Sequence, residues 1–282
     1  MAITLDQIKE LRAKTGAGMA DCKKALEEAG GDLEKSIEIL RKKGAMLATK
    51  RADKITNEGA IKDAFSEDRT AGAIVEVNCE TDFVAKGDDF QNFSKSVADA
   101  ALSANSSDVD AVLKAKVNGL TVQEHLDALM GKVGEKIEVK RVKNVNSKDG
   151  FIADYIHFGS KLGGLVAFKG NKNEESLDLG KKIAMQLVAM NPISIKREDI
   201  GADVIEKEKD IYKTQLLNEG KKENILDKII GNKIEKFYQE NVLMEQSFIQ
   251  DEKKSIGDLI KDYNKKTGDN LEILEIVRFQ LG

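Results

Sequence analysis

The apolar stretch Gly72-Ala-Ile-Val-Glu-Val77 recurs 92 residues later as Gly164-Leu-Val-Ala-Phe-Lys169. A second related pair precedes it, Gly59-Ala-Ile-Lys-Asp63 and Gly150-Phe-Ile-Ala-Asp154, at an offset of 91. Two apolar runs that flank a short polar turn are typical of a β-hairpin. The chain is therefore expected to contain the same hairpin twice, at the centre of two related units.

An apolar pattern with helical spacing follows each predicted hairpin, which indicates that each unit pairs a sheet with a helix. The first pattern is Phe90, Phe93, Val97 and Ala101, and the second is Leu179, Ile183, Leu187 and Met190.

Two later matches extend the repeat at a larger offset of 134. Thr121-Val122-Gln-Glu124 matches Ser255-Ile256-Gly-Asp258, and the stretch from Gly134 to Val139 matches the one from Gly268 to Ile273. The change in offset leaves 42 extra residues in the second copy, which must lie before Ser255.

This insertion contains two amphipathic helical patterns on either side of Asn218-Glu219-Gly220-Lys221, which predicts a helical hairpin. Two interpretations stay open. The hairpin is a structural antiparallel pair with no partner, or it uses a partner to cover the rest of its apolar stripe. The patterns are Ile200, Val204, Ile211, Tyr212 and Leu216, then Leu226, Ile229, Ile230, Ile234 and Phe237.

The first 54 residues read as three short helices. Thr4 and Gln7 fit a capping box, glycines follow at Thr15-Gly16-Ala17-Gly18 and at Gly30-Gly31, and Asp32 can cap the third helix. We therefore predict an α+β fold in four segments. They are a three-helix module (1–54), a first core subdomain (55–146), a second core subdomain (147–196 and 243–282) and the helical-hairpin insertion (197–242).

Composition narrows the class of protein. The 45 basic and 49 acidic residues are interleaved and only 5% of residues are aromatic, which argues against direct binding to nucleic acid. No apolar run approaches the ~20 residues of a membrane span, and the first seven residues do not resemble a secretory signal. A cytoplasmic protein that meets another protein is the expected class.

Signals of catalysis are few. The sequence has no phosphate-binding loop or dinucleotide fingerprint, and the glycines of Gly159–Gly164 are interpreted as turn residues inside the second hairpin. A nucleophilic pair of Cys79 with His125 or His157 is conceivable, but a structural thiol is the favoured interpretation. No catalytic residue, cofactor or metal ligand is therefore expected.

One segment, Cys79–Gly87, carries a large aromatic residue beside a carboxylate where the strand alternation stops. By default Phe83 would be expected to tuck into the core. The alternative is that a loop presents Phe83 and Asp82 to a partner.

Two long stretches match a known family. Thr15-Gly-Ala-Gly-Met-Ala-Asp-Cys-Lys-Lys-Ala-Leu26 and Val77-Asn-Cys-Glu-Thr-Asp-Phe-Val-Ala-Lys86 closely resemble the two signature stretches of the bacterial elongation factor Ts family. The resemblance covers essentially the whole chain, including Ile156-His157-Phe-Gly-Ser-Lys-Leu-Gly163 and Val277-Arg278-Phe279. It implies a ubiquitin-associated-like N-terminal module, two related core subdomains, and a coiled-coil hairpin that is a candidate surface for a homodimer.

The resemblance also implies a function in translation, namely guanine nucleotide exchange on elongation factor Tu without bond chemistry of its own. Thr81, Asp82, Phe83 and Val84 match the loop that intrudes near the magnesium site of elongation factor Tu. There, a wedge would weaken the binding of GDP, and GTP would then displace the factor.

Arg12 and Met19 match positions of the N-terminal module that contact the nucleotide domain of elongation factor Tu. Ala20 replaces a second Met of some relatives, which is expected to weaken this contact. The chain ends at Gly282, so the contacts of a C-terminal helix found in some members are not expected. Two other classes stay open, a general adaptor for ubiquitin-like partners and a thiol enzyme that uses Cys79.

Overall fold

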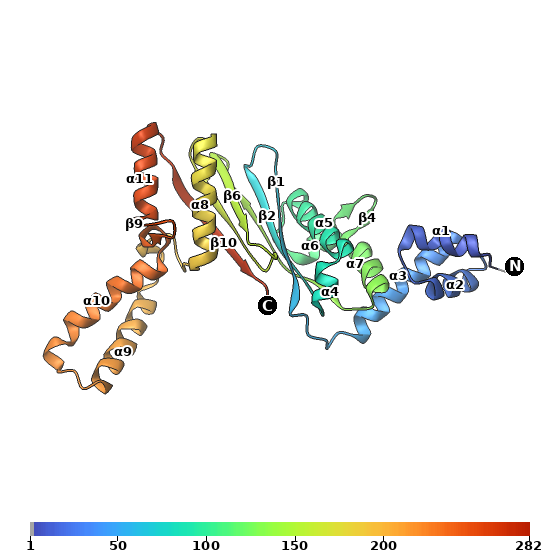
Figure 1. Ribbon diagram of the computed structural model, residues 1–282, viewed down its shortest axis with the longest axis horizontal. Coiled ribbons are helices and arrows are strands. Elements are labelled where there is room, and N and C mark those ends of the chain that lie inside the picture. Colours follow the sequence, from blue (N-terminus) through green and yellow to red (C-terminus); the bar gives the residue numbers. More distant parts are fainter. Residues whose placement is uncertain (1–2) are drawn as a thin grey trace. The chain divides into compact units, whose positions relative to one another are not determined.

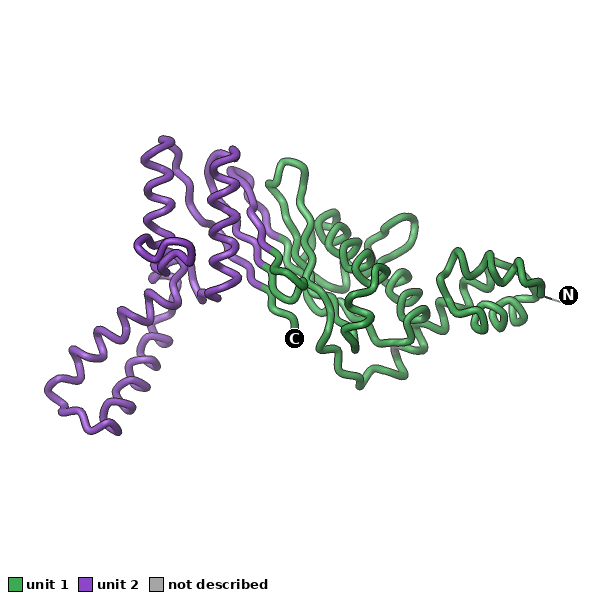
Figure 2. Tube along the Cα trace, viewed as in Figure 1, with its two compact units in different colours: residues 1–144, 156–163, 279–282 green, residues 145–155, 164–278 purple. Residues whose placement is uncertain are grey.

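The computed structural model describes residues 3–282, so Met1 and Ala2 at the start of the predicted module lie outside the described residues. Three helices come first and a mixture of strands and helices follows, so the predicted α+β class is confirmed (Figure 1). Two compact units are distinguished (Figure 2). The first contains residues up to Asn144 together with Ile156–Gly163 and Phe279–Gly282, and the second contains Val145–Tyr155 and Gly164–Arg278.

Three helices form where the N-terminal segment predicts them: α1 (Leu5–Thr15), α2 (Met19–Glu28) and α3 (Leu33–Lys50). The predicted capping box is present, since the Gln7 backbone N–H donates to Thr4 Oγ1 at 3.3 Å. Asp32 caps α3 as expected. The buried side chains that hold the three helices together are Ile8, Leu11, Ala17, Cys22, Ala25 and Leu26.

Helix α3 continues past the charged run at residues 41–43 as far as Lys50. The reason is a tertiary contact, because Gly44 lies directly against the backbone of α7 (Val122–Val133). Arg41 also donates a hydrogen bond to Glu124 at 3.3 Å. A helix that packs against another element is stabilised beyond its own propensity.

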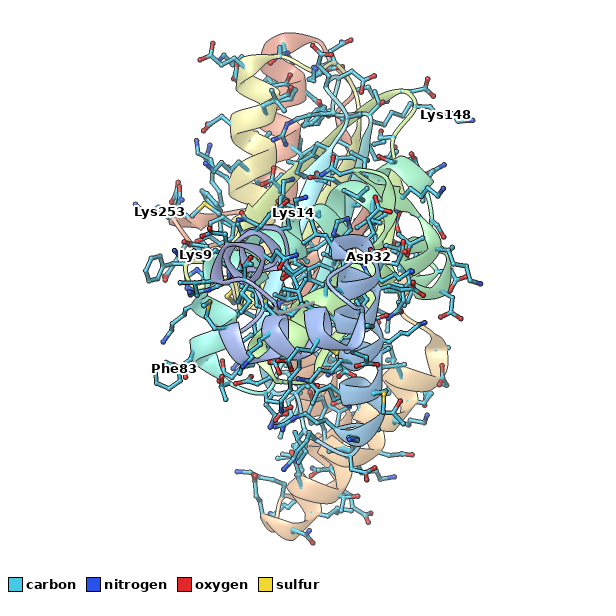
Figure 3. The ribbon with its side chains drawn as sticks, turned by 90° about the vertical axis from the view of Figure 1, so that its right-hand side faces the viewer. Lys9, Lys14, Asp32, Phe83, Lys148 and Lys253 are labelled. Atoms are coloured by element: carbon cyan, nitrogen blue, oxygen red, sulfur yellow. The ribbon has the colours of Figure 1, made fainter. Side chains whose placement is uncertain are left out.

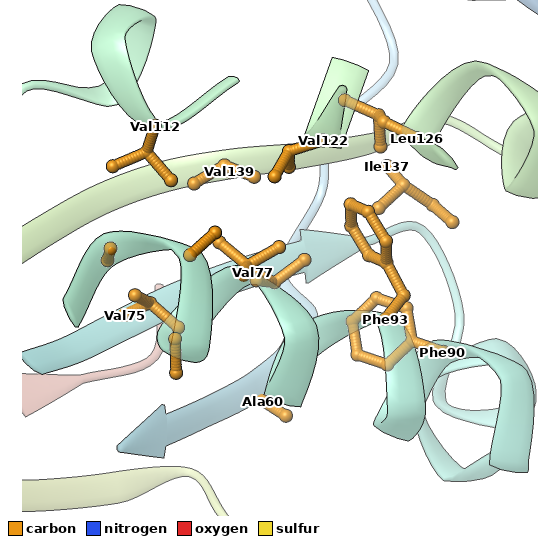
Figure 4. Close-up of a cluster of buried hydrophobic side chains, with 14 of the residues drawn as sticks. Ala60, Val75, Val77, Phe90, Phe93, Val112, Val122, Leu126, Ile137 and Val139 are labelled. Atoms are coloured by element: carbon orange, nitrogen blue, oxygen red, sulfur yellow. The ribbon is translucent and has the colours of Figure 1, made fainter. Parts of the chain in front are cut away.

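The sheet of the first unit has the order β1-β2-β5, formed by Glu58–Phe65, Ala71–Cys79 and Ile137–Asn146. β1 and β2 are antiparallel, which confirms the first predicted hairpin. Helix α5 (Asp88–Ala104) packs on β1 and β2, and both α5 and α7 contribute side chains to the core of this unit (Figure 4). Its labelled members include Val75, Val77, Phe90, Phe93, Val122, Leu126, Ile137 and Val139.

The sheet of the second unit has the order β10-β7-β6, formed by Glu272–Gln280, Leu162–Lys169 and Gly150–Ile156. Helices α8 (Glu174–Met190) and α11 (Ile256–Thr267) contribute side chains to its core. That core includes Phe151, Val166, Phe168, Ile183, Leu187, Ile256, Ile260 and Ile273.

The internal repeat is visible in matched helix ends. Helices α7 and α11 each have 12 residues and begin at a capping box, on Thr121 and on Ser255. Each ends at a glycine with a left-handed backbone, Gly134 (φ 75°) and Gly268 (φ 73°). Glycine adopts this conformation without the steric cost of a Cβ, so the same local chemistry ends both helices.

The insertion is a pair of helices, α9 (Ala202–Asn218) and α10 (Glu223–Asn241), which confirms the predicted helical hairpin (Figure 1). Two details of the predicted stripe are wrong. Ile205, not Val204, is the buried residue near the start of α9, and Ile211 is exposed. Only the side chains on one face of α9 meet α10. A predicted stripe that is shifted by one residue therefore assigns the wrong side chains to that face. The buried residues are Ile205, Leu216, Leu226, Ile230 and Ile234.

The remaining elements are short. They are α4 (Asp82–Lys86), α6 (Val109–Lys114), β3 (Lys116–Val117), β4 (Leu120–Thr121), η1 (Arg197–Asp199), η2 (Leu243–Glu245), β8 (Ser247–Phe248) and β9 (Asp251–Ser255). Among residues 3–282, no helix combines the length and the apolar character that crossing a membrane requires.

Candidate functional site

The segment after β2 is a one-turn helix, α4, where the sequence predicted a loop. Thr81 is the reason, because its hydroxyl accepts a hydrogen bond from the Val84 backbone N–H at 3.4 Å and caps the turn. The backbone N–H and the hydroxyl of Thr81 also donate to Glu135 at 3.1 and 2.8 Å. The start of α4 is thus tied to the segment that precedes β5.

Phe83 points away from the core, with 85% of its surface exposed. Figure 3 shows its ring at the margin of the molecule. The expectation that Phe83 tucks into the core is wrong, and the reason is helical geometry. Ala85 is buried and Val84 packs partly against the core, so α4 turns that side inward and leaves Phe83 on the other.

Asp82 carries a negative charge beside this ring. Its carboxylate accepts a hydrogen bond from Lys86 Nζ at 2.7 Å, one helical turn away. This hydrogen bond and the charge of Lys86 lower the pKa of Asp82 below its ordinary value. The exposed surface of α4 therefore presents an apolar ring next to a carboxylate that is ionised at neutral pH.

Glu80 braces the junction between β2 and α4. Its carboxylate accepts hydrogen bonds from Arg51 Nε and Nη2, both at 2.6 Å, and from the Lys136 backbone N–H at 2.6 Å. The hydrogen bonds from Arg51 are the main cause that lowers the pKa of Glu80 to about 2. Sequence reasoning missed this brace, because the three partners are far apart in the chain and share no local pattern.

Cys79 is a structural thiol, as favoured from the sequence. The side chain is fully buried and its Sγ donates to the Thr81 carbonyl at 3.2 Å. Burial raises the pKa of the Cys79 thiol to about 12, so almost none of it is thiolate at neutral pH. His125 Nε2 lies 2.9 Å from the Val117 carbonyl instead. Burial and a raised pKa of the thiol both disfavour the alternative of a Cys79 nucleophile.

A hollow of about 480 Å³ adjoins α4, and we call it the α4 hollow. It is lined by α4, by the start of β1, by Gln91 of α5 and by the turn between β6 and β7, which includes the glycine interpreted as a turn residue, Gly159 (φ 84°). Two ion pairs lie in its wall, Asp82–Lys86 and Glu58–Lys161, each at 2.7 Å. Its lining residues are Glu58, Gly59, Asp82, Ala85, Lys86, Gln91, Gly159, Ser160 and Lys161.

The two predicted residues of the N-terminal helices are also at the surface. Arg12 lies on the last turn of α1 and is exposed, and Met19 begins α2 with 37% of its surface exposed. They flank the turn at residues 16–18. Within residues 3–282, no group of three or more His, Cys, Asp or Glu side chains is arranged to hold a metal ion.

Comparison with known proteins places the chain among the translation elongation factors. Residues 80–282 match the family model described as Elongation factor TS. Elongation factor Ts of Prosthecochloris aestuarii is 44% identical over 284 residues, and that of Chlorobaculum parvum is 45% identical, each with 99% of both chains covered. The chain belongs to the elongation factor Ts family, which confirms the resemblance carried by its two signature stretches.

Proposed function

We propose that this protein is a guanine nucleotide exchange factor that binds elongation factor Tu with GDP bound and promotes release of the GDP. The observation that carries the proposal is the exposed ring of Phe83 beside the ionised carboxylate of Asp82 on a braced one-turn helix. Membership of the elongation factor Ts family supports the choice of partner.

The energetics of α4 favour a role at an interface. Burying a Phe side chain contributes about 1.5–3 kcal/mol of stabilisation. In the free chain the Phe83 ring stays exposed to water, so this stabilisation is absent. Contact with a partner would bury the ring and supply this free energy. The brace from Glu80 to Arg51 and the tie from Thr81 to Glu135 hold α4 in place, so little conformational entropy is lost when it docks.

The proposed action is on the magnesium and phosphate site of the GTPase. Mg²⁺ is held by oxygen ligands and neutralises the charge of the bound phosphates. A wedge that inserts an apolar ring and a carboxylate near the metal weakens this arrangement. The factor and the nucleotide then destabilise each other by the same coupling free energy, so incoming GTP displaces the factor. Val84 supports the wedge from the core side, and Thr81 caps it.

The other parts of the chain have proposed roles as well. Arg12 and Met19 contact the nucleotide domain of elongation factor Tu from a ubiquitin-associated-like module over residues 1–54. The core subdomains span 55–146 and 147–196 with 243–282, and the hairpin at 197–242 is a candidate dimer contact. The protein works in the cytoplasm, without a cofactor, a membrane or direct contact with nucleic acid, and makes or breaks no covalent bond.

The deciding experiment is release of a fluorescent GDP analogue from purified elongation factor Tu. This protein is added at about one tenth of the GTPase concentration, with excess unlabelled GDP as the chase. A catalytic exchange factor accelerates release far beyond its own stoichiometry. Release at the spontaneous rate would show that the proposal is wrong.

A further inference from the structure

The turn between β6 and β7 carries Phe158, whose side chain is 96% exposed. Among the large hydrophobic side chains of the described residues it is the most exposed, and it exceeds even Phe83. An isolated exposed apolar residue is common on protein surfaces. Phe158 differs from an isolated exposed residue because it lies on a hydrogen-bonded turn that lines the α4 hollow.

The backbone of this turn is held in place. The His157 N–H donates to the Leu162 carbonyl at 2.9 Å, and the Ser160 N–H donates to the His157 carbonyl at 2.9 Å. The Ser160 carbonyl in turn accepts from the Ile61 N–H of β1 at 2.7 Å. A ring presented on a fixed backbone loses little entropy when a partner binds it, since only its own rotamers are restricted.

Phe83 and Phe158 are each next in sequence to a residue that lines the α4 hollow. Phe83 follows Asp82 of α4, and Phe158 precedes Gly159 of the turn between β6 and β7. The hollow itself is polar, because its wall holds the ion pairs Asp82–Lys86 and Glu58–Lys161. The surface thus combines a polar depression with two exposed aromatic residues, each next in sequence to one of its lining residues.

We propose that Phe158 is a second aromatic anchor for the same GTPase partner, which places a convex segment with a polar tip and apolar flanks in the α4 hollow. This inference rests on the proposed function. Asp82 puts a charge next to Phe83, whereas the neighbours of Phe158 are His157 and Gly159 and carry no carboxylate. Phe158 therefore supplies affinity, and Phe83 with Asp82 disturbs the metal site.

The test measures the affinity for elongation factor Tu and the rate of GDP release at a saturating concentration of each variant. Phe158→Ala is expected to raise Kd about tenfold and to leave the saturated rate within about twofold of wild type. Phe158→Leu should recover part of the affinity. The matched control is Ile193→Ala, an exposed apolar residue of the second unit, which should leave both values unchanged.

The outcomes separate the two proposals. If wild type neither binds elongation factor Tu nor accelerates release, the proposed function is wrong and the anchor falls with it. If wild type is active and Phe158→Ala binds as tightly as Ile193→Ala, the anchor alone is overturned. A lower melting temperature of Phe158→Ala with unchanged Kd would also overturn it, since the ring would then have a structural role.

Discussion

A Cβ atom on Gly44 of α3 would lie 1.9 Å from the backbone carbonyl oxygen of Asp127 in α7. No side chain fits at this distance, so the close approach of the two helices depends on glycine at position 44. On the α7 side, a Cβ on Gly131 would lie 3.5 Å from Gly44 Cα, which is ordinary contact. The absence of a side chain at this position therefore lets the long third helix lie directly on α7.

Gly44→Ala is expected to separate α3 from α7 and to lower the free energy of unfolding by about 1–3 kcal/mol, the usual cost of overpacking. Gly231→Ala is the matched control, because Gly231 is also inside a helix but a Cβ there would meet nothing within 4 Å. That control should gain up to about 1 kcal/mol from helix propensity. The free energy of unfolding of both variants is measured in urea. If Gly44→Ala is as stable as Gly231→Ala, the close contact at Gly44 is contradicted.

In the proposed function the ring acts on the partner, so Phe83→Ala is expected to slow GDP release at saturating factor by about tenfold or more. The free energy of unfolding should stay within about 0.5 kcal/mol of wild type, as is usual for exposed positions. Stopped-flow release and thermal unfolding are measured on the same preparation. Asp82→Ala should change the rate in the same direction.

The buried Phe90 provides the contrast for Phe83. Phe90→Ala should lose about 3–5 kcal/mol of stability, because it leaves a cavity in the core of the first unit. A destabilised Phe83→Ala with a normal release rate per folded molecule would contradict the wedge.

Glu80→Gln should weaken the brace at the end of β2 by about 1–2 kcal/mol at pH 7, since hydrogen bonds to a charged group are lost. The pKa of Glu80 is about 2 in the folded protein, below its unfolded value. Its stabilisation is therefore fully present above the unfolded pKa, near 4.5, and is lost as the pH falls toward 2.

Urea unfolding at pH 7, 4 and 3 should show the difference between wild type and Glu80→Gln shrinking as the pH falls. Glu28→Gln at the exposed end of α2 serves as the control and should show a small difference at every pH. A difference for Glu80→Gln that does not change between pH 7 and 3 would show that its ionisation contributes nothing.

Replacing residues 200–240 with a short Gly-Ser linker should leave a cooperative fold. The chain enters and leaves the insertion side by side, since Ser194 pairs with Val242 and the Ile193 N–H donates to the Asn241 carbonyl at 2.9 Å. The hairpin has its own small core, so the core of the second unit does not depend on it. Calorimetry reports the fold, and global unfolding of this variant would refute the prediction.

Arg12→Ala and Met19→Ala should each weaken binding to elongation factor Tu, by about 1 kcal/mol or more if they are anchors. Both side chains are at the surface, so stability should change little. Titration calorimetry gives the affinity, with Lys9→Ala on the same helix as the control. Unchanged affinity in both variants would remove the proposed role of the N-terminal helices.

Local patterns along the chain were enough to predict the three N-terminal helices, the two hairpins, a helix after each hairpin and the helical insertion. The caps at Thr4, Asp32, Thr121 and Ser255 satisfy backbone groups within three residues of themselves, so they are encoded wherever the chain folds. The hairpin repeat and the 42-residue insertion follow from pattern and spacing alone. The two signature stretches were likewise enough to predict the family.

Tertiary structure decided the direction of side chains and the supports of the site. Phe83 could have packed inward on sequence evidence, and its exposure follows from which side of α4 meets the core. The brace joins Glu80 to Arg51 and to Lys136, which are 29 and 56 residues away. Short-range patterns encode hydrogen bonds between neighbours, whereas burial and long-range ion pairs exist only once distant segments share the same space.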